Sequence, residues 1–255
     1  MNVLVCVKRV PMTGGTIVLT PDGQAIATQH LGFTISPHEE CGVEEAVRIV
    51  ERHGGESVVL TLGPPEAEEQ LRDALALGID RAIHLVTDGE EWDAQATAAA
   101  IAAAVEAERA AGIEYDLLLF GNESADAGGY QVGVRVAHRL GLPCATGLKS
   151  LAVEGGRIRC EQEAPGGRDV YDLPLPAVVT VKEGLNLPRY PSVPGRMRAQ
   201  RKPVAASRPA RPEPRLERLR LVVPGGQRKQ AEILGHGPEA APRVVEVLER
   251  IGVLT

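Results

Sequence analysis

The chain has 255 residues, of which 44% are hydrophobic and 3% aromatic, and it carries a formal net charge of −6 at pH 7. This length allows one domain with a sizeable core and an appendage, and because the sequence has neither an apolar run of the roughly 18–20 residues that span a bilayer nor a secretory leader pattern, we expect no membrane insertion. The four cysteines contain no C-x-x-C pair, so we expect neither a zinc site nor a redox pair, and a reducing, cytoplasmic location.

Strands and helices alternate over about the first 140 residues of the sequence. Aliphatic and β-branched runs predict strands at residues 3–7, 57–62, 82–86 and 117–120. Apolar stripes with capping signals predict helices at residues 37–53, 66–77, 93–111 and 132–140, and Pro21-Asp22-Gly23 predicts the turn of a hairpin at 16–28. The alternation predicts an α/β fold with a mostly parallel, doubly wound sheet covered by helices on both faces.

Ligands of such a sheet bind at the carboxyl ends of its strands, here residues 6–8, 62–64 and 120–122, together with the loop 36–39. The stretch 117–133, LLLFGNESADAGGYQVG, is the most informative of these. Its order of strand, glycine-bounded loop and helix presents free N–H groups to a phosphate. It has neither a Walker Gly-Lys-Ser/Thr nor a G-x-G-x-x-G fingerprint, so we expect its ligand to be bound rather than hydrolysed.

The residues around this loop form no convincing catalytic set. Ser124 lacks the G-x-S-x-G elbow of a nucleophile, and the six histidines contain no H-x-x-x-H pair. Glu123 and Asp126 could form a metal pair, but acids in a glycine-rich loop more often accept hydrogen bonds from N–H groups or a ribose, so we expect no metal. Cys6 is expected to be a small buried residue that lets a ligand approach.

The sequence pattern changes after about residue 144. Residues 148–181 predict an antiparallel meander, with hairpin turns at Gly155-Gly156 and Gly166-Gly167. Residues 183–214 are dense in proline and arginine and predict an extended arm with little structure of its own. Residues 238–251 predict a last helix whose apolar stripe needs a surface to cover it.

The positive charge of the chain is concentrated in the second half of this arm and the residues that follow it. Residues 196–220 contain eight Arg, one Lys and two Glu, a net charge of +7, so the rest of the chain carries −13. Such a basic segment can contact an acidic partner or the acidic body of its own chain. It has no aromatic residue to stack on bases, and its prolines prevent a continuous basic helix, so we expect no nucleic-acid binding.

Four segments in order carry a specific resemblance: VLVCVKRVP at 3–11, SPHEECGVEEAVRI at 36–49, GPPEAEEQLRDALALGIDRAIHL at 63–85, and LPAVVTVKEGLNLPRYPSVPGRMRA at 175–199. Together they resemble the β subunit of the electron transfer flavoproteins over nearly the whole chain. The resemblance implies an adenine nucleotide α-hydrolase-like sheet in residues 1–182, meander included. It further implies a recognition loop and extended arm at 183–237, and a terminal helix at 238–255 that packs on the α subunit or on the core.

The resemblance also implies a function. A β subunit of this family forms a heterodimer with an α subunit, which holds most of the FAD near the interface, and it carries a buried AMP of structural role. Electrons enter from primary dehydrogenases such as acyl-CoA dehydrogenases, as in fatty acid oxidation, and leave to a membrane quinone oxidoreductase. The subunit is then an electron carrier rather than an enzyme.

Carried over by motif, the expected AMP contacts lie at the carboxyl ends of the strands, where two side chains would flank the adenine and the glycine loop would meet the ribose and phosphate. These residues are Cys6, Ser36, Pro37, His38, Glu39, Leu62, Gly121, Asn122, Glu123, Ser124, Ala125, Asp126, Gly128, Gly129, Tyr130, Gln131 and Val132. Glu163 matches a carboxylate near the flavin side of the interface, where it could pair with an arginine of the α subunit; the alternative is a charge on a strand surface.

The expected docking site for dehydrogenases is the segment of the recognition loop around Val193, the hydrophobic anchor, with Arg189, Tyr190, Pro191 and Pro194 beside it. Many relatives have Leu at this position and lysines where this chain has mostly arginines. Two alternatives stay open. One is a nucleotide sensor or stress-type protein without flavin. The other is a bifurcating relative with a second FAD in place of AMP, whose Asp-Thr-Ala differs from the Gly128-Gly129-Tyr130 found here.

Overall fold

The computed structural model describes the chain except for residues 13, 15–16, 217, 224–231 and 255. The described residues form a nine-stranded sheet in the order β11-β5-β4-β1-β6-β10-β7-β8-β9, and a small antiparallel pair, β2 with β3. The strands are β1 Val3–Val7, β2 Val10–Pro11, β3 Phe33–Thr34, β4 Ser57–Gly63, β5 Arg81–Val86, β6 Leu117–Gly121, β7 Cys144–Glu154, β8 Arg157–Ala164, β9 Gly167–Pro174, β10 Ala177–Val181 and β11 Val204–Ser207. All neighbours from β11 to β7 pair in parallel, so the predicted mostly parallel sheet is confirmed.

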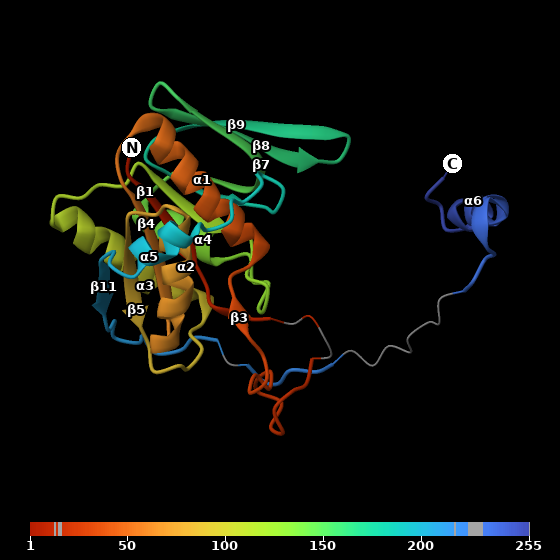
Figure 1. Ribbon diagram of the computed structural model, residues 1–255, viewed down its shortest axis with the longest axis horizontal. Helices are drawn as coiled ribbons and strands as arrows, with labels where there is room; N and C mark the ends of the chain where they lie inside the picture. The colour runs from red at the N-terminus through yellow and green to blue at the C-terminus, as the bar shows by residue number, and fades with distance from the viewer. Residues whose placement is uncertain (13, 15–16, 217, 224–231, 255) are drawn as a thin grey trace.

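Helices cover both faces of this sheet, as predicted (Figure 1). The helices are α1 Pro37–His53, α2 Glu68–Leu77, α3 Ala94–Ala110, α4 Val132–Leu140, α5 Val193–Ala199 and α6 Ala241–Arg250. Side chains of α1 and α2 form one hydrophobic cluster with the sheet, and side chains of α3 and α4 form the other. The local starts and stops also match the sequence signals, since Ser36 caps α1 in a capping box and Gly78 follows α2 with a positive φ.

The central strand β1 contributes side chains to both hydrophobic clusters. Val3, Val5 and Val7 point into the α1/α2 cluster, whereas Leu4 and Cys6 point into the α3/α4 cluster. All five are at most 5% exposed, and burying each aliphatic side chain of this kind stabilises the fold by about 1.5–3 kcal/mol. A strand that is apolar on both faces must lie inside a sheet covered on both sides.

The meander predicted at 148–181 is only partly correct. The hairpins β7-β8 and β8-β9 are antiparallel; the first turns at Gly155-Gly156 as predicted, and the second turns one residue earlier than predicted, at Pro165-Gly166. However, β10 pairs in parallel with both β6 and β7, so the chain returns from the hairpins into the middle of the sheet. The physical reason is composition: AVVTV of β10 is buried at every position, which suits a central parallel strand and not an edge strand with one solvated face.

The prediction that the arm has little structure of its own is wrong for two parts of it. Residues 193–199 form α5, which begins after the N-cap Ser192 and lies against α2, where a Cβ on Gly195 would come within 2.6 Å of the Ala76 carbonyl. Residues 204–207 form β11, which adds a parallel edge strand beside β5. The arm therefore extends the sheet and its helical layer.

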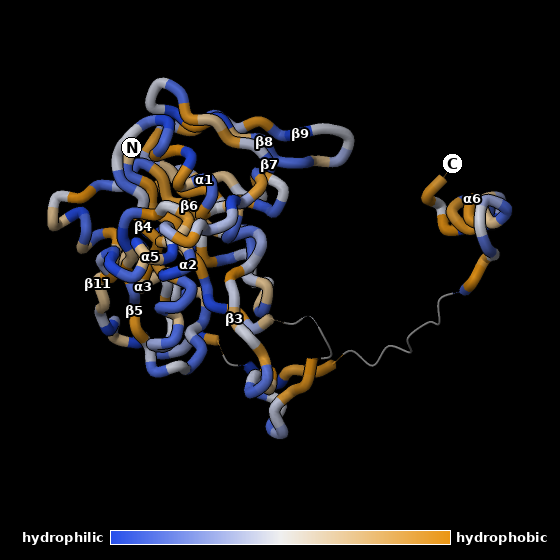
Figure 2. The backbone as a smooth tube through the Cα atoms, in the orientation of Figure 1, coloured by the Kyte–Doolittle hydropathy of each residue, from blue (hydrophilic) through white to orange (hydrophobic). Residues whose placement is uncertain are grey.

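Two predicted elements lie outside this sheet. Leu19 and Ile26 form an antiparallel bridge across the predicted turn at Pro21–Gly23, while Thr16, at the start of that hairpin, lies outside the described residues. The last helix is confirmed as α6, preceded by a short 3-10 turn at Gly237–Ala240. α6 buries none of its residues and stands apart from the sheet (Figure 1), and its apolar residues are visible in Figure 2. No helix among the described residues has the length and apolar content to cross a membrane.

An ion-pair cluster attaches the arm to α1. The Arg189 guanidinium donates to the buried Glu44 carboxylate, with Nε to Oε2 at 2.9 Å, and to Glu51, with Nη1 to Oε1 at 2.7 Å. Arg48 donates to the same Glu44 from one turn further along α1. Burial alone would raise the pKa of the Glu44 carboxyl, but the hydrogen bonds from Arg189 outweigh it and lower that pKa. Glu44 is therefore ionised at neutral pH and holds the arm.

We expect Glu44→Gln to lower the free energy of unfolding by about 1–3 kcal/mol, because an amide NH₂ would face the Arg189 guanidinium where a carboxylate oxygen now accepts. Glu51→Gln is the matched control, since Glu51 is exposed and its loss should cost less than about 1 kcal/mol. Urea unfolding followed by circular dichroism measures both. Equal losses would contradict the assignment of Glu44 as the anchor.

Candidate functional site

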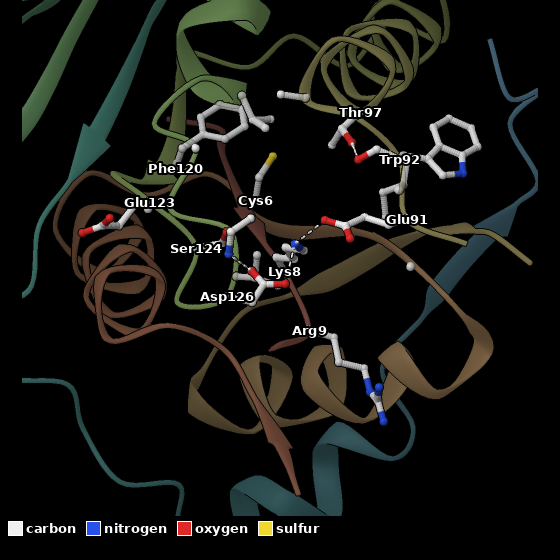
Figure 3. Close-up of a pocket in the computed structure, with 18 of the residues that line it drawn as sticks. Cys6, Lys8, Arg9, Glu91, Trp92, Thr97, Phe120, Glu123, Ser124 and Asp126 are labelled. Carbon is white, nitrogen blue, oxygen red and sulfur yellow. Dashed lines mark hydrogen bonds and ion pairs between the residues drawn. The ribbon is translucent and has the colours of Figure 1, made fainter. Parts of the chain in front are cut away.

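A cavity of about 460 Å³ opens at the carboxyl edge of the sheet. The ends of β1, β4 and β6 form its floor, through Cys6, Leu60 and Phe120, and the loop after β5 forms its rim (Figure 3). This volume is within the range of about 300–1,000 Å³ that is typical of small-molecule sites. The cavity therefore lies where a ligand of a doubly wound sheet is expected.

Most of the residues expected to contact a nucleotide line this cavity. They are Cys6, Glu39, Leu62, Gly121, Asn122, Glu123, Ser124, Asp126, Gly129, Tyr130, Gln131 and Val132. The others line a second hollow of about 360 Å³ that borders the same loop. Those residues are Ser36, Pro37, His38, Ala125 and Gly128. Four residues of the loop, Glu123, Ser124, Asp126 and Ala127, line both hollows.

The buried Glu39 carboxylate ties the elements at this edge together. Its Oε1 accepts from the Lys8 backbone N at 2.9 Å, and its Oε2 accepts from the Ser36 backbone N at 2.9 Å. Burial raises the pKa of Glu39 to about 8, against the opposing effect of these two donors. Burial also raises the pKa of the Cys6 thiol, so Cys6 is a neutral, unreactive contact surface at physiological pH.

Two residues of the glycine-rich loop have a left-handed backbone conformation. Tyr130 takes a left-handed φ of 55°, uncommon for a residue other than glycine, and Gly128 has a φ of 54°. Gln131, the N-cap of α4, makes no capping hydrogen bond and bonds Arg135 instead. The N–H groups in the first turn of α4 are therefore without a side-chain cap at the border of the cavity.

A lysine crosses the mouth of the cavity between two carboxylates. Lys8 Nζ lies 2.6 Å from Asp126 Oδ2 and 4.0 Å from Glu91 Oε1 (Figure 3). The Asp126 side chain is only 20% exposed. Burial would raise the pKa of the Asp126 carboxyl, but the Lys8 ammonium outweighs it and the pKa is lowered. Asp126 is thus an ionised partner of Lys8, and the glycine-rich loop is tied to the end of β1.

The rim after β5 is a part of the site that the sequence analysis missed. It contributes Glu90, Glu91, Trp92 and Asp93 to the lining. Trp92 is 8% exposed, and its Nε1 is buried with no hydrogen-bond partner among the described residues. The signal was present, since residues 82–86 were expected to be a strand of the same parallel sheet, whose carboxyl end must meet the same edge.

The remaining predicted residues lie away from this cavity. Glu163 is exposed near the end of β8, opposite Arg168 on β9. Tyr190 and Val193 are 96% and 73% exposed, and Pro194 is exposed beside them, while Pro191 is half-buried. Arg189 is occupied by Glu44 and Glu51. The structure thus separates the nucleotide residues, Glu163 and the docking residues into three places.

Comparison with known proteins identifies the family. The family described as "Electron transfer flavoprotein domain" matches residues 24–211. The chain is 38% identical over 225 residues to the protein named "Electron transfer flavoprotein subunit beta" of Syntrophomonas wolfei, which covers 88% of this chain and 86% of the relative. Proteins of the same name from Bacillus subtilis (32% identity, 97% of each chain) and Homo sapiens (35% identity, 82% of each chain) are similar along most of their length. A match of this extent, on a sheet with its cavity at the carboxyl edge, means that the chain belongs to the electron transfer flavoprotein family.

Proposed function

We propose that this chain is the β subunit of a cytoplasmic, heterodimeric electron transfer flavoprotein. It accepts electrons from primary dehydrogenases, such as acyl-CoA dehydrogenases, through FAD at its interface with an α subunit, and it passes them to a quinone oxidoreductase. It is an electron carrier without substrate turnover of its own. The observation that carries the proposal is the family match along most of the chain, together with the cavity at the carboxyl edge.

The cavity supports AMP as the bound nucleotide. Its floor is apolar, with Cys6, Leu62 and Phe120 placed to contact a planar base. The glycine-rich loop and the uncapped start of α4 supply N–H groups for a phosphate.

FAD, when bound, supplies reversible electron storage, and this chain contributes a surface to it rather than an enclosed site. Glu163 is exposed on β8 and does not line the nucleotide cavity. A carboxylate in that position can pair with a cation of a partner subunit and change the potential that the flavin experiences. This arrangement favours FAD held mainly by the α subunit.

The arm supports a transient docking site. Tyr190 and Val193 are exposed next to the Arg189 anchor, and Val193 is the first residue of α5. Because Glu44 and Ser192 already hold this segment in place, little further order is lost when a partner binds. An apolar side chain held in this way can fill a partner's pocket and still be released quickly.

The ligand inventory of the purified protein tests the proposal most directly. We expect the chain, co-expressed with an α subunit, to purify as a yellow heterodimer that releases one FAD and one AMP per dimer on acid denaturation. Chromatography of the released nucleotides measures the ratio. Two FAD and no AMP would establish the bifurcating alternative, and a colourless monomer would contradict the carrier function.

The only tryptophan of the chain provides a second test. Since Trp92 lines the cavity, AMP binding should change its fluorescence emission in a saturable titration. Trp92→Phe should abolish the signal while calorimetry still detects binding. If AMP binds by calorimetry and the emission of the wild-type protein stays constant, the nucleotide site lies elsewhere.

Docking is tested with Val193→Ala. We expect about five- to thirtyfold slower reduction of the flavin by a dehydrogenase, the usual effect of truncating an interface anchor, with flavin content unchanged. Val170→Ala removes an exposed apolar side chain of the same type from β9 and serves as the control. Stopped-flow absorbance measures both rates. Equal rates in the two variants would remove Val193 as the anchor.

A further inference from the structure

The basic segment that follows β11 returns to the mouth of the nucleotide cavity. We call residues 208–216 and 218–222 the basic strap. Leu216 of the strap lines the cavity. The Arg215 backbone N donates to Asp93 Oδ2 at 3.1 Å, on the rim. Further along, the Leu221 backbone N donates to the Gly23 carbonyl at 2.7 Å, so the strap is held at the rim and again at the turn Pro21–Gly23.

Arginines of the strap pair with carboxylates of the rim. Arg211 forms an ion pair with Glu90 and donates to the Glu91 carbonyl at 2.9 Å. Arg218 forms an ion pair with the Glu91 carboxylate and donates to the Gln24 carbonyl at 2.8 Å. The charge imbalance between the arm and the rest of the chain is therefore compensated in part within the molecule, at this rim.

Glu91 belongs to two ion pairs at once. One of its carboxylate oxygens faces Arg218 of the strap, and the other lies 4.0 Å from Lys8 Nζ. Lys8 in turn contacts Asp126, which belongs to the glycine-rich loop (Figure 3). A continuous series of alternating charges, Asp126–Lys8–Glu91–Arg218, thus joins the loop to the strap.

We propose that the basic strap is a lid on the nucleotide cavity, and that Glu91 couples its seating to the presence of a nucleotide. The proposal rests on the nucleotide site proposed above. A nucleotide that orders the glycine-rich loop keeps Asp126 and Lys8 in place, and Lys8 holds Glu91 where Arg218 reaches it. By thermodynamic reciprocity, a seated strap raises the affinity for the nucleotide by the same factor by which the nucleotide stabilises the seated strap, and we expect this difference mainly in the rate of nucleotide release.

Nucleotide release measures one side of this coupling. The full-length chain, purified with its α subunit, is loaded with radiolabelled AMP by exchange and chased with unlabelled AMP. We expect Arg218→Gln to release the label about three- to tenfold faster than wild type, in keeping with the loss of one ion pair over a closed site. Arg220→Gln is the control, because it removes the same charge from the strap at a residue with no ion pair among the described residues, and it should stay within about twofold of wild type.

Digestion with trypsin measures the other side of this coupling, which is the effect of the nucleotide on the strap. Trypsin can cleave the strap after Arg215, Arg218 and Arg220, because each of them is followed by leucine. Arg208 and Arg211 precede proline and resist cleavage. Mass spectrometry of the fragments identifies the cleaved bonds. We expect AMP to slow cleavage of the strap several-fold in the wild type. Glu91→Gln should abolish this protection while AMP still binds, since the amide no longer attracts both Lys8 and Arg218.

The outcomes separate this inference from the proposed function. Absence of any AMP binding to the wild type would overturn the nucleotide site and the lid with it. Tight AMP binding with equal release from Arg218→Gln and Arg220→Gln, and with no protection of the strap, would overturn the lid alone. Faster release from Arg218→Gln only, with AMP-dependent protection that Glu91→Gln removes, would support it.

Discussion

Burial of β1 on both faces of the sheet is the constraint on which the rest of the molecule depends. Cys6 pairs with Leu60 of β4 on one side and with Phe120 of β6 on the other, so β1 lies in the interior of the sheet. Its alternate side chains need two separate apolar layers, and α1 with α2, and α3 with α4, provide them. Parallel pairing in register then brings the carboxyl ends of β1, β4 and β6 to one edge, where the cavity lies.

The polar groups at that edge are satisfied by a small number of buried contacts. Glu39 accepts from the ends of two elements, and the Ser36 hydroxyl donates to the Glu123 carbonyl at 3.3 Å, so α1 holds both β1 and the glycine-rich loop. The Asn122 Oδ1 accepts from the Thr180 hydroxyl of β10 at 2.9 Å, which gives the start of the same loop a second support. Contacts with α1 and β10 therefore hold the end of β1 and the start of the loop, as expected of a largely preformed site.

Electrostatics explains why the arm has a definite course. Arg189 is held by the buried Glu44, Arg72 donates from α2 to the Ala199 and Lys202 carbonyls at 2.8 Å each, and the strap arginines meet the acidic rim. Ion pairs at exposed sites contribute little singly, but a sequence of them along one segment selects one path over the surface. The exposed apolar residues between these contacts are left available to a partner, as at Val193.

The amino-acid sequence alone predicts the elements whose signals are local. The apolar run of β1, the Ser36-Pro37 start of α1 and the glycine after α2 each predicted the element that is observed, because capping and hydrophobic periodicity act within a few residues. It also determined the family and the loop at the edge of the sheet. The insertion of β10 between β6 and β7 and the extension of the sheet by β11 beside β5 depend on tertiary contacts. The same is true of the position of Trp92 at the rim of the cavity and of Arg218 against Glu91. These are contacts between residues far apart in the chain, and their free energy depends on burial and charge partners that no local pattern encodes.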